Sequence, residues 1–427
     1  MFSIVAAMAF HWSCDNNDPD RFTGEDHDPA KPVEVFSFEP DSGGLATKVF
    51  ISGSNFGSDR SKIKVFFNDT PAPVIGSDGN NLFVITPSQP GRENVITVEA
   101  HGKTHAFQGK KFLYRTMHVV RTISGRKGTG RFRPGRLIEA EYQYPSTLTV
   151  DQNGDVFLSH WRVPYSFIRI SEAEDVVEYL EPGSETNTTY AFGAPTVDSK
   201  GVVSAISDNG ATYFTFDPVE GWSPRQRSII LADPVIQRST VHSLAAHPVT
   251  GDLYTRYYTS GQLIKVDPTS RVASFVCNTV PGSDSYLVFD PVNPDVVYIA
   301  YDGVNYIGKV DLTTLEHSIF AGSTTGHQDG PILEARFNRP SQLIVAPDGS
   351  LYVADRGNHC IRRIILDSEE GPIVQTVLGK PGVRGYRDGN PEDALFDEPR
   401  GVAISPIDGS IYISEWGNNV VRKITIE

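Results

Sequence analysis

The stretch Phe337-Asn338-Arg339-Pro340, followed by Asp348-Gly349 and Leu351-Tyr352-Val353-Ala354-Asp355, decides the fold because it recurs near the end of the chain. The second copy reads Phe396-Asp397-Glu398-Pro399, Asp408-Gly409 and Ile411-Tyr412-Ile413-Ser414-Glu415. The offset is 59 residues at the prolines and 60 after the Asp-Gly pair, as one inserted residue would give. Self-similarity of this kind is the signature of a repeat architecture.

Four earlier units extend the repeat toward the N-terminus. The first runs from Ala140 to Ile170, and three more degenerate units cover residues 194–216, 242–266 and 286–310. Each unit reads as an inner strand, an Asp-Gly or Asn-Gly hairpin, a second strand, a Gly/Asn turn and a third strand. A sheet this small cannot bury both faces alone, so radial stacking into a six-bladed β-propeller over residues 116–427 is predicted.

Closure of the ring is also readable from the sequence. The chain stops at Ile424-Thr425-Ile426-Glu427, after a third strand, while His118 to Ser124 precedes the first unit as a lone strand. We expect this lone strand to complete the sixth blade, because the pairing hides two exposed sheet edges at once.

The repeat elements point to a known family. The Asp-Gly, Ala-Asp-x-x-Asn and Ile-Arg elements of the fifth and sixth units resemble NHL repeats. The resemblance implies an NHL-type propeller.

Residues 32–115 form a second region, with short alternating runs separated by turn residues, which is typical of a β-sandwich. Phe38-Glu39-Pro40, Ser42-Gly43-Gly44 and Gly53-Ser54-Asn55-Phe56-Gly57 resemble the TIG/IPT immunoglobulin-like domain. Gly53, Gly57 and Asn55 suit a structural corner, so a spacer role is favoured here. The expected fold is therefore all-β: an N-terminal immunoglobulin-like β-sandwich (TIG/IPT) followed by a six-bladed NHL-type β-propeller.

The N-terminus resembles a lipoprotein signal. The apolar stretch Met1–Trp12 is too short to span a bilayer as a helix, and Cys14 is followed by an acidic run. The resemblance implies a signal peptide at 1–13, a diacylated Cys14, an acidic flexible linker at 14–31 and export to the surface of the outer membrane. A buried N-terminal strand is the alternative, and the absence of Lys or Arg before Cys14 leaves open a start upstream of Met1.

Net charge and cysteine spacing restrict the classes of ligand and partner that the sequence supports. The net charge of -14 argues against nucleic acid, which needs a basic face. Cys14, Cys277 and Cys360 are too far apart for a zinc site or a disulfide framework to be inferred. No motif assigns a catalytic residue, a metal ligand or a cofactor, although Ca²⁺ or another divalent cation in the channel stays open.

In a propeller, the loops between blades and those joining second to third strands share one face, here called the top face. Aromatic and polar residues gather in these loops, and sugars favour aromatic platforms beside hydrogen-bonding side chains. The predicted ligand-binding residues are Trp161, Arg162, Tyr165, Tyr257, Tyr258, Tyr301, Asp302, Arg356, His359 and Trp416. Packing of the aromatics between blades is the alternative, while Asp355, Asn358 and Glu415 are expected to satisfy their own turn.

The favoured function is binding or handling of glycan as an accessory of polysaccharide capture. The resemblance to TIG/NHL lipoproteins implies an outer-membrane location through a lipid anchor, with other polysaccharide-import proteins as further partners. Two alternatives stay open: a carbohydrate-active hydrolase or lyase with a channel-bound cation, and a protein-binding NHL scaffold.

Overall fold

The computed structural model describes residues 24–426 except 45–46, 88–91, 108, 116–117, 161–165, 181–190, 291 and 369–370. Contacts divide the chain into two compact units, with the boundary in the sequence between residues 117 and 118. The described residues form β-strands and short 3-10 turns, and none of their helices is long and apolar enough to cross a membrane. The predicted all-β fold is confirmed.

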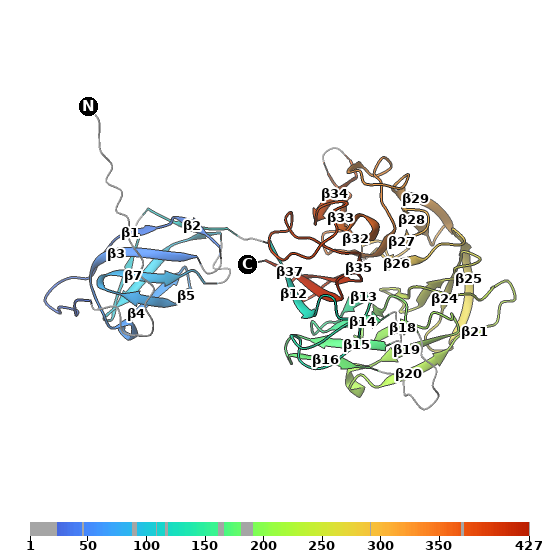
Figure 1. Cartoon of the computed structure of the whole chain (residues 1–427), viewed down its shortest axis with the longest axis horizontal. Helices are drawn as coiled ribbons and strands as arrows, with labels where there is room; N and C mark the ends of the chain where they lie inside the picture. Colours follow the sequence, from blue (N-terminus) through green and yellow to red (C-terminus); the bar gives the residue numbers. More distant parts are fainter. Residues whose placement is uncertain are drawn as a thin grey trace. The chain divides into compact units, whose positions relative to one another are not determined.

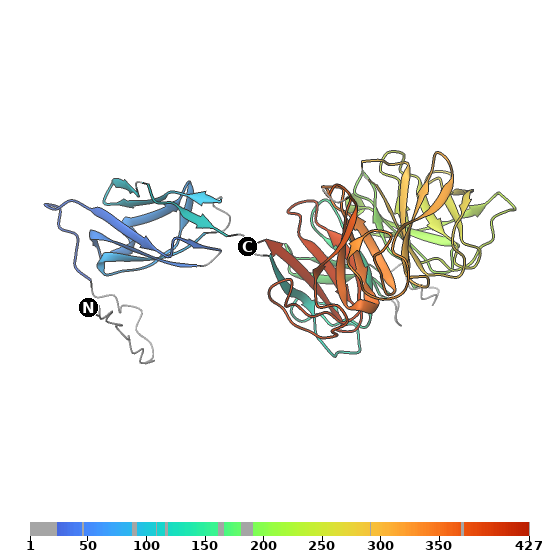
Figure 2. The same ribbon diagram turned by 90° about the horizontal axis from the view of Figure 1, so that it is seen from above.

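The first unit is a β-sandwich, whose sheets Figure 2 shows stacked. One sheet has the strand order β1 (Glu34–Glu39), β3 (Lys48–Gly57), β7 (Gly79–Ile85) and β6 (Val74–Ser77). The second has the order β10 (Lys103–Ala106), β9 (Ile96–Ala100), β4 (Ile63–Phe67) and β5 (Thr70–Ala72). A small sheet joins β2 (Ser42–Gly43), β11 (Phe112–Tyr114) and β8 (Glu93–Asn94). Inward-pointing Phe38, Phe67 and Phe112 are fully buried in the core.

The predicted structural corner at Gly53–Gly57 ties the incoming chain to this sandwich. Asn55 adopts the left-handed conformation (φ 61°). Its side-chain oxygen accepts the Asp28 N–H at 2.7 Å, and its amide donates to the carbonyls of Asp28 and Lys31 at 2.9 Å. The part of the predicted linker that the structure describes is therefore held against the first unit.

The second unit is a ring of six sheets (Figure 1). From the centre outward, blade 1 has β13 (Pro145–Val150), β14 (Val156–His160), β15 (Ser166–Ser171) and β16 (Val176–Tyr179). Blade 2 has β17 (Thr196–Val197), β18 (Val203–Ile206), β19 (Thr212–Phe216) and β20 (Pro224–Ser228). Blade 3 has β22 (Ala245–Ala246), β23 (Leu253–Arg256), β24 (Gln262–Val266), β25 (Val272–Asn278) and β21 (Ile230–Leu231).

The other three blades follow the same plan. Blade 4 has β26 (Ser285–Phe289), β27 (Val296–Tyr301), β28 (Tyr306–Asp311) and β29 (Glu316–Ala321). Blade 5 has β31 (Pro340–Val345), β32 (Leu351–Asp355), β33 (Cys360–Ile365), β34 (Ile373–Leu378) and β30 (Gly330–Pro331). Blade 6 has β35 (Pro399–Ile404), β36 (Ile411–Glu415), β37 (Val420–Ile426) and β12 (His118–Gly125).

Strand β12 closes the ring in the manner expected from the sequence. It pairs antiparallel with β37 from His118 opposite Ile426 to Gly125 opposite Val420. The six innermost strands contact one another in sequence, and β13 of blade 1 contacts β35 of blade 6. Because N- and C-terminal strands share one sheet, separating them would expose two edges.

The repeated acidic residue at the end of the second strand is a structural group. Asp355 and Arg362 form a fully buried ion pair at 2.9 Å, and Glu415 and Arg422 form another at 2.7 Å. Asn358 also donates to Asp355 at 2.8 Å. Burial raises the pKa of both carboxyls. Asp355, Asn358 and Glu415 therefore satisfy their own turns, as the sequence indicates.

Candidate functional site

The candidate site is the top-face entrance to the central channel, where the inner strands begin. We call it the channel mouth and define it by two sets of residues. In blades 2 to 6, the first set directly follows the fully buried residue at or just after the end of the second strand: Asp208, Tyr258, Asp302, Arg356 and Trp416. The second set lies at the start of the inner strands: Tyr144, His242, Asp284, Arg339, Glu398 and Arg400.

Three successive blade junctions pair a residue of the first set with one of the second. Between blades 4 and 5, Arg339 Nε donates to Asp302 Oδ1 at 3.0 Å. Between blades 5 and 6, Arg356 Nη2 donates to Glu398 Oε2 at 2.8 Å. Between blades 6 and 1, the rings of Trp416 and Tyr144 lie 4.8 Å apart. The repeat thus places one side-chain contact at the same position of each of these three junctions.

The inner-strand residue of each pair has a strained backbone. Tyr144, Arg339 and Glu398 have φ angles of 57°, 54° and 48°, and each directly precedes a proline. A left-handed conformation is unfavourable for a residue with a Cβ, and the following proline restricts the backbone further. Strain of about 1–3 kcal/mol per residue persists only where the surroundings enforce it, and such residues cluster at functional sites.

The surroundings here enforce the strain through one hydrogen bond per junction. The backbone N–H of Arg339 donates to Asn305 Oδ1 at 2.7 Å, that of Glu398 to His359 Nδ1 at 3.0 Å, and that of Tyr144 to Asn419 Oδ1 at 2.9 Å. The three acceptor residues occupy equivalent turns and are themselves left-handed, with φ angles of 62°, 56° and 59°. The same backbone-to-side-chain hydrogen bond therefore fixes Tyr144, Arg339 and Glu398 at the mouth.

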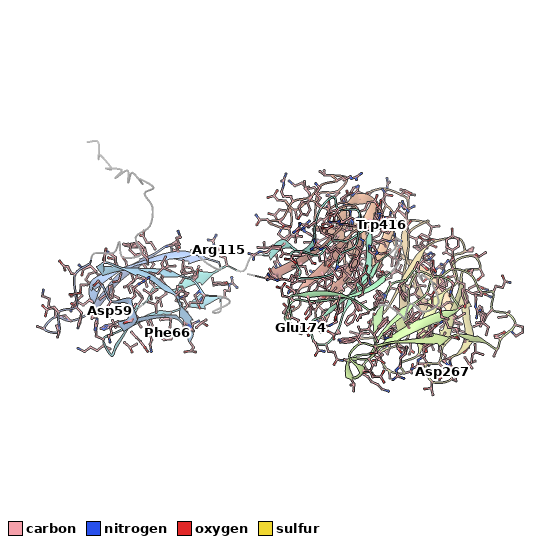
Figure 3. The ribbon with its side chains drawn as sticks, turned by 60° about the horizontal axis from the view of Figure 1, so that its bottom comes forward. Asp59, Phe66, Arg115, Glu174, Asp267 and Trp416 are labelled. Atoms are coloured by element: carbon pink, nitrogen blue, oxygen red, sulfur yellow. The ribbon has the colours of Figure 1, made fainter. Side chains whose placement is uncertain are left out.

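Arg356 connects the pairs into one arc. Its Nη1 lies 3.6 Å from Asp302 Oδ2, and its guanidinium carbon lies 5.5 Å from the centroid of the Trp416 ring. The arc runs from Arg339 in blade 5 through Asp302, Arg356 and Trp416 to Tyr144 in blade 1. Trp416, labelled in Figure 3, is half-buried in this arc.

A buried arginine lies beneath the arc. Arg400 Nη2 donates to the Tyr286 hydroxyl at 3.0 Å, which joins blade 6 to blade 4. The guanidinium carbon of Arg400 also lies 4.6 Å from the centroid of the Trp416 ring. Both Arg400 and Tyr286 are almost completely buried, so they form the floor of the channel mouth.

The blade 3 side of the floor carries a histidine and a second buried arginine. His242 Nε2 lies 3.3 Å from Asp284 Oδ1, and the His242 ring meets the Tyr258 ring edge-on at 5.7 Å. Burial lowers the pKa of His242, the Asp284 carboxylate opposes this shift, and the charges of Arg400 and Arg256 add to it. His242 and Arg256 therefore complete the floor on this side of the channel mouth.

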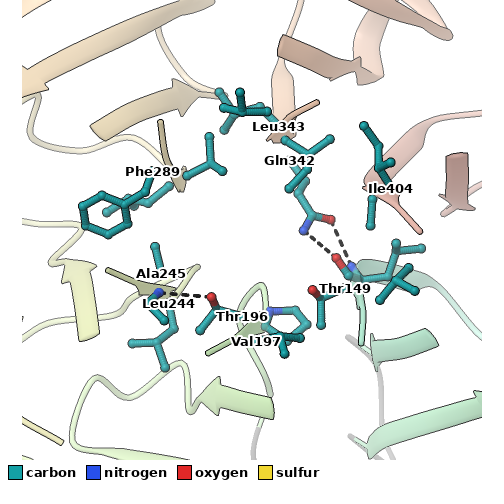
Figure 4. Close-up of a pocket in the computed structure, with 18 of the residues that line it drawn as sticks. Thr149, Thr196, Val197, Leu244, Ala245, Phe289, Gln342, Leu343 and Ile404 are labelled. Atoms are coloured by element: carbon teal, nitrogen blue, oxygen red, sulfur yellow. Dashed lines mark hydrogen bonds between the residues drawn. The ribbon is translucent and has the colours of Figure 1, made fainter. Parts of the chain in front are cut away.

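The channel has a separate cavity of about 280 Å³ on its hairpin side. Later residues of the six inner strands line it, including Thr149, Thr196, Phe289 and Ile404 (Figure 4). Gln342 bridges three blades at this level: it accepts the Leu148 and Val402 N–H groups at 3.0 and 3.3 Å and donates to the Leu148 carbonyl at 2.7 Å. None of the predicted ligand-binding residues that the structure describes lines this cavity.

The structure brings together four predicted site residues and places a fifth behind them. Asp302, Arg356 and Trp416 share the arc, and Tyr258 lies beside His242. His359 supports the arc through Glu398 instead of contributing to its surface. Trp161, Arg162 and Tyr165 lie outside the described residues, as does Cys14.

Tyr257 and Tyr301 differ from the expectation of rim residues, because both are fully buried. Tyr301 ends β27 and Tyr257 directly follows β23, in positions equivalent to Asp355 and Glu415 and one residue before the mouth position. The Tyr257 hydroxyl donates to the Gly210 carbonyl at 3.0 Å, and the Tyr301 hydroxyl lies 3.0 Å from His317 Nε2. Neither ring offers a face to a ligand in this structure.

Sequence reasoning missed the contribution of the inner strands: Tyr144, His242, Asp284, Arg339, Glu398 and Arg400. A signal was present for three of them, because the residue before the proline at the start of a repeat is Tyr144, Arg339 or Glu398. Such a residue is restricted by its proline and lies where loops enter the top face.

Among the described residues, no group of three or more His, Cys, Asp or Glu side chains is arranged to hold a metal ion. Cys277 and Cys360 are buried free thiols.

Two domain families match the chain. The IPT/TIG domain matches residues 34–114, and the NHL repeat matches residues 337–364. The predicted resemblance to both families is confirmed.

Two solved structures are similar over nearly the whole chain. An auxiliary nutrient binding protein from Bacteroides ovatus is 25% identical with a TM-score of 0.76, and the match covers 94% of this chain and 100% of that one. A Bacteroides thetaiotaomicron protein of unknown function is 27% identical with a TM-score of 0.65, at the same coverage of both chains.

Among curated proteins, the chain is 28% identical over 148 residues to Protein SUPPRESSOR OF QUENCHING 1, chloroplastic, from Arabidopsis thaliana. That match covers 32% of this chain and only 13% of the plant protein.

Proposed function

We propose that this protein is a cell-surface accessory of nutrient capture that binds glycan at the channel mouth of its propeller. The observation that carries the proposal is the repeated strain at Tyr144, Arg339 and Glu398. The strained backbone that fixes these three neighbouring side chains at the channel entrance lowers the stability of the fold. Side chains that are already fixed lose less conformational entropy when a ligand binds, so the strain favours a binding role.

The chemistry of the mouth fits a sugar. A half-buried tryptophan and two tyrosines, Tyr144 and Tyr258, can lie against the C–H faces of a sugar ring. The arginines and carboxylates of the arc offer donors and acceptors to hydroxyl groups. The likeness to the Bacteroides ovatus protein supports a role in nutrient binding.

The proposal includes the location expected from the sequence. Lipidation of Cys14 would hold the protein at the outer membrane, and residues after it would place the propeller outside the lipid. Other outer-membrane polysaccharide-import proteins are then the natural partners.

A glycan array probed with the purified protein tests the proposal. Binding of a defined set of glycans is expected, and the variant Arg356→Ala should abolish it because Arg356 joins Asp302, Glu398 and Trp416. Binding that survives in the Arg356→Ala protein would place the ligand elsewhere. Absence of binding to any glycan would overturn the proposed ligand class.

A further inference from the structure

We propose that the channel mouth selects glycans that carry an anionic group, a carboxylate or a sulfate ester, and that Arg339 receives this group. The inference rests on the proposed function, since it names the ligand class of the same site. Three observations on the charges of the mouth carry it.

First, the guanidinium of Arg339 has terminal N–H groups that can donate to a ligand. Its side chain is 52% exposed, and its only side-chain hydrogen bond within the described part of the chain runs from Nε to Asp302 Oδ1. The two terminal amino groups therefore face no acceptor among the described residues. A guanidinium with a free fork of N–H groups matches the geometry of carboxylate and sulfate oxygens better than that of a single hydroxyl.

Second, the floor holds a cation whose partners are neutral. Arg256 donates to Thr279 Oγ1 and the Ser283 carbonyl at 2.8 Å and to Ser285 Oγ at 2.9 Å. Within the described residues, no carboxylate lies at ion-pair distance from Arg256, although only 1% of the residue is exposed. Arg400 is the other buried guanidinium of the floor, and the Tyr286 hydroxyl is one of its partners. A buried charge is poorly screened, so its field reaches the entrance above it.

Third, three carboxylates of the mouth are already engaged. Asp302 binds Arg339 and Arg356, Glu398 binds Arg356, and Asp284 contacts His242. With Asp208 of blade 2, four carboxylates stand beside the guanidinium groups of Arg256, Arg339, Arg356 and Arg400, so these side chains balance in charge. A balanced mouth in a chain whose net charge is -14 repels anions less than the rest of the surface does.

The test compares ligands and variants. The probes are three classes of immobilised oligosaccharide: neutral, uronic-acid-containing and sulfated. Titration calorimetry then measures the affinity of the best binder for the parent protein and three variants. Arg339→Gln removes the charge, Arg339→Lys keeps it without the fork, and Arg225→Gln is the matched control on the outer strand β20, where Arg225 pairs with Glu220.

We expect only glycans with an anionic group to bind, and the class bound distinguishes carboxylate from sulfate. Arg339→Gln should weaken binding about tenfold or more, as for loss of a charge-assisted hydrogen bond, Arg339→Lys should weaken it less, and Arg225→Gln should leave it unchanged. Melting curves of the variants confirm that they are folded.

Two results would overturn the inference and leave the proposed function intact: binding of neutral glycans as tightly as anionic ones, or equal affinity in the parent and Arg339→Gln proteins. Failure to bind any of the three classes would overturn the proposed function itself, and this inference with it.

Discussion

The guanidinium of Arg400 lies over the Trp416 ring, 4.6 Å from its centroid, so one of the chain's four tryptophans is both a mouth residue and a packing partner. Arg356 and Tyr144 contact the same ring. The position of the Trp416 ring therefore depends on residues from blades 5, 6 and 1.

Replacing this ring tests its role. We expect Trp416→Ala to weaken glycan binding by about 2 kcal/mol, or roughly thirtyfold, the lower end of what a hot-spot aromatic contributes. Loss of the cation–π contact should cost about 1 kcal/mol of stability. Calorimetry and thermal melting measure the two effects, and Trp416→Phe should recover part of each. Unchanged affinity with a sharply lower melting temperature would show that Trp416 serves packing alone.

Backbone strain at Glu398 predicts an unusual order of stability. Glu398→Ala and Glu398→Gly both remove the partner of Arg356, but only glycine adopts φ 48° without a Cβ penalty. We expect the Gly variant to be more stable than the Ala variant by about 1 kcal/mol. This reverses the usual order, in which a glycine variant is less stable because glycine loses more backbone entropy on folding. Urea denaturation of both variants measures the difference. The usual order, with alanine more stable, would mean that this residue is unstrained in solution.

His359 predicts a pH dependence. Burial lowers its pKa, and its Nδ1 must be unprotonated to accept the Glu398 N–H. The unfolded chain then binds more protons below the ordinary histidine pKa of about 6.5, so stability falls as the pH drops below that value, by up to about 1 kcal/mol at pH 5.5.

The variant His359→Asn isolates this contribution, because asparagine tolerates a positive φ and already accepts the same hydrogen bond at Asn305 and Asn419. We expect its melting temperature to fall less than that of the parent between pH 7.5 and 5.5. An identical fall in both proteins would assign the pH effect to other groups.

Closure by β12 predicts a steep loss of stability when the strand is damaged. Val120 is fully buried against blades 5 and 6, whereas the neighbouring Val119 is only half-buried. Val120→Asp should destabilise the propeller by about 3 kcal/mol or more, since it buries an unpaired charge, and Val119→Asp should have a much smaller effect. Deleting residues 115–125 should be worse still. A deleted protein that melts like its parent would contradict closure through this strand.

The expected lipid anchor predicts a change of location. Cys14→Ala should release the protein from the membrane fraction of its native host or leave the signal uncleaved, because no acceptor for the lipid remains. Fractionation and mass spectrometry of the N-terminus measure both outcomes. Unmodified Cys14 in the mature protein would contradict the anchor.

The sequence alone determined the architecture. Repeated turns such as Asp348-Gly349 and Asp408-Gly409 mark the hairpins, and the short apolar runs at the start of Leu351–Asp355 and Ile411–Glu415 mark the second strands. Both signals are local, since each occupies only a few consecutive residues of the sequence. The unpaired strand His118–Ser124 completed the ring, because a propeller of incomplete blades leaves edges exposed.

Only the tertiary structure decided which side chains meet. Tyr257 and Tyr258 are adjacent in the sequence, yet Tyr257 is buried and Tyr258 belongs to the mouth, because the Tyr257 side chain packs inward and donates to the Gly210 carbonyl. Arg400 and Tyr286 are 114 residues apart and meet across the channel. Contacts between blades depend on how six sheets twist and stack around one axis, and no local period of the sequence carries that information.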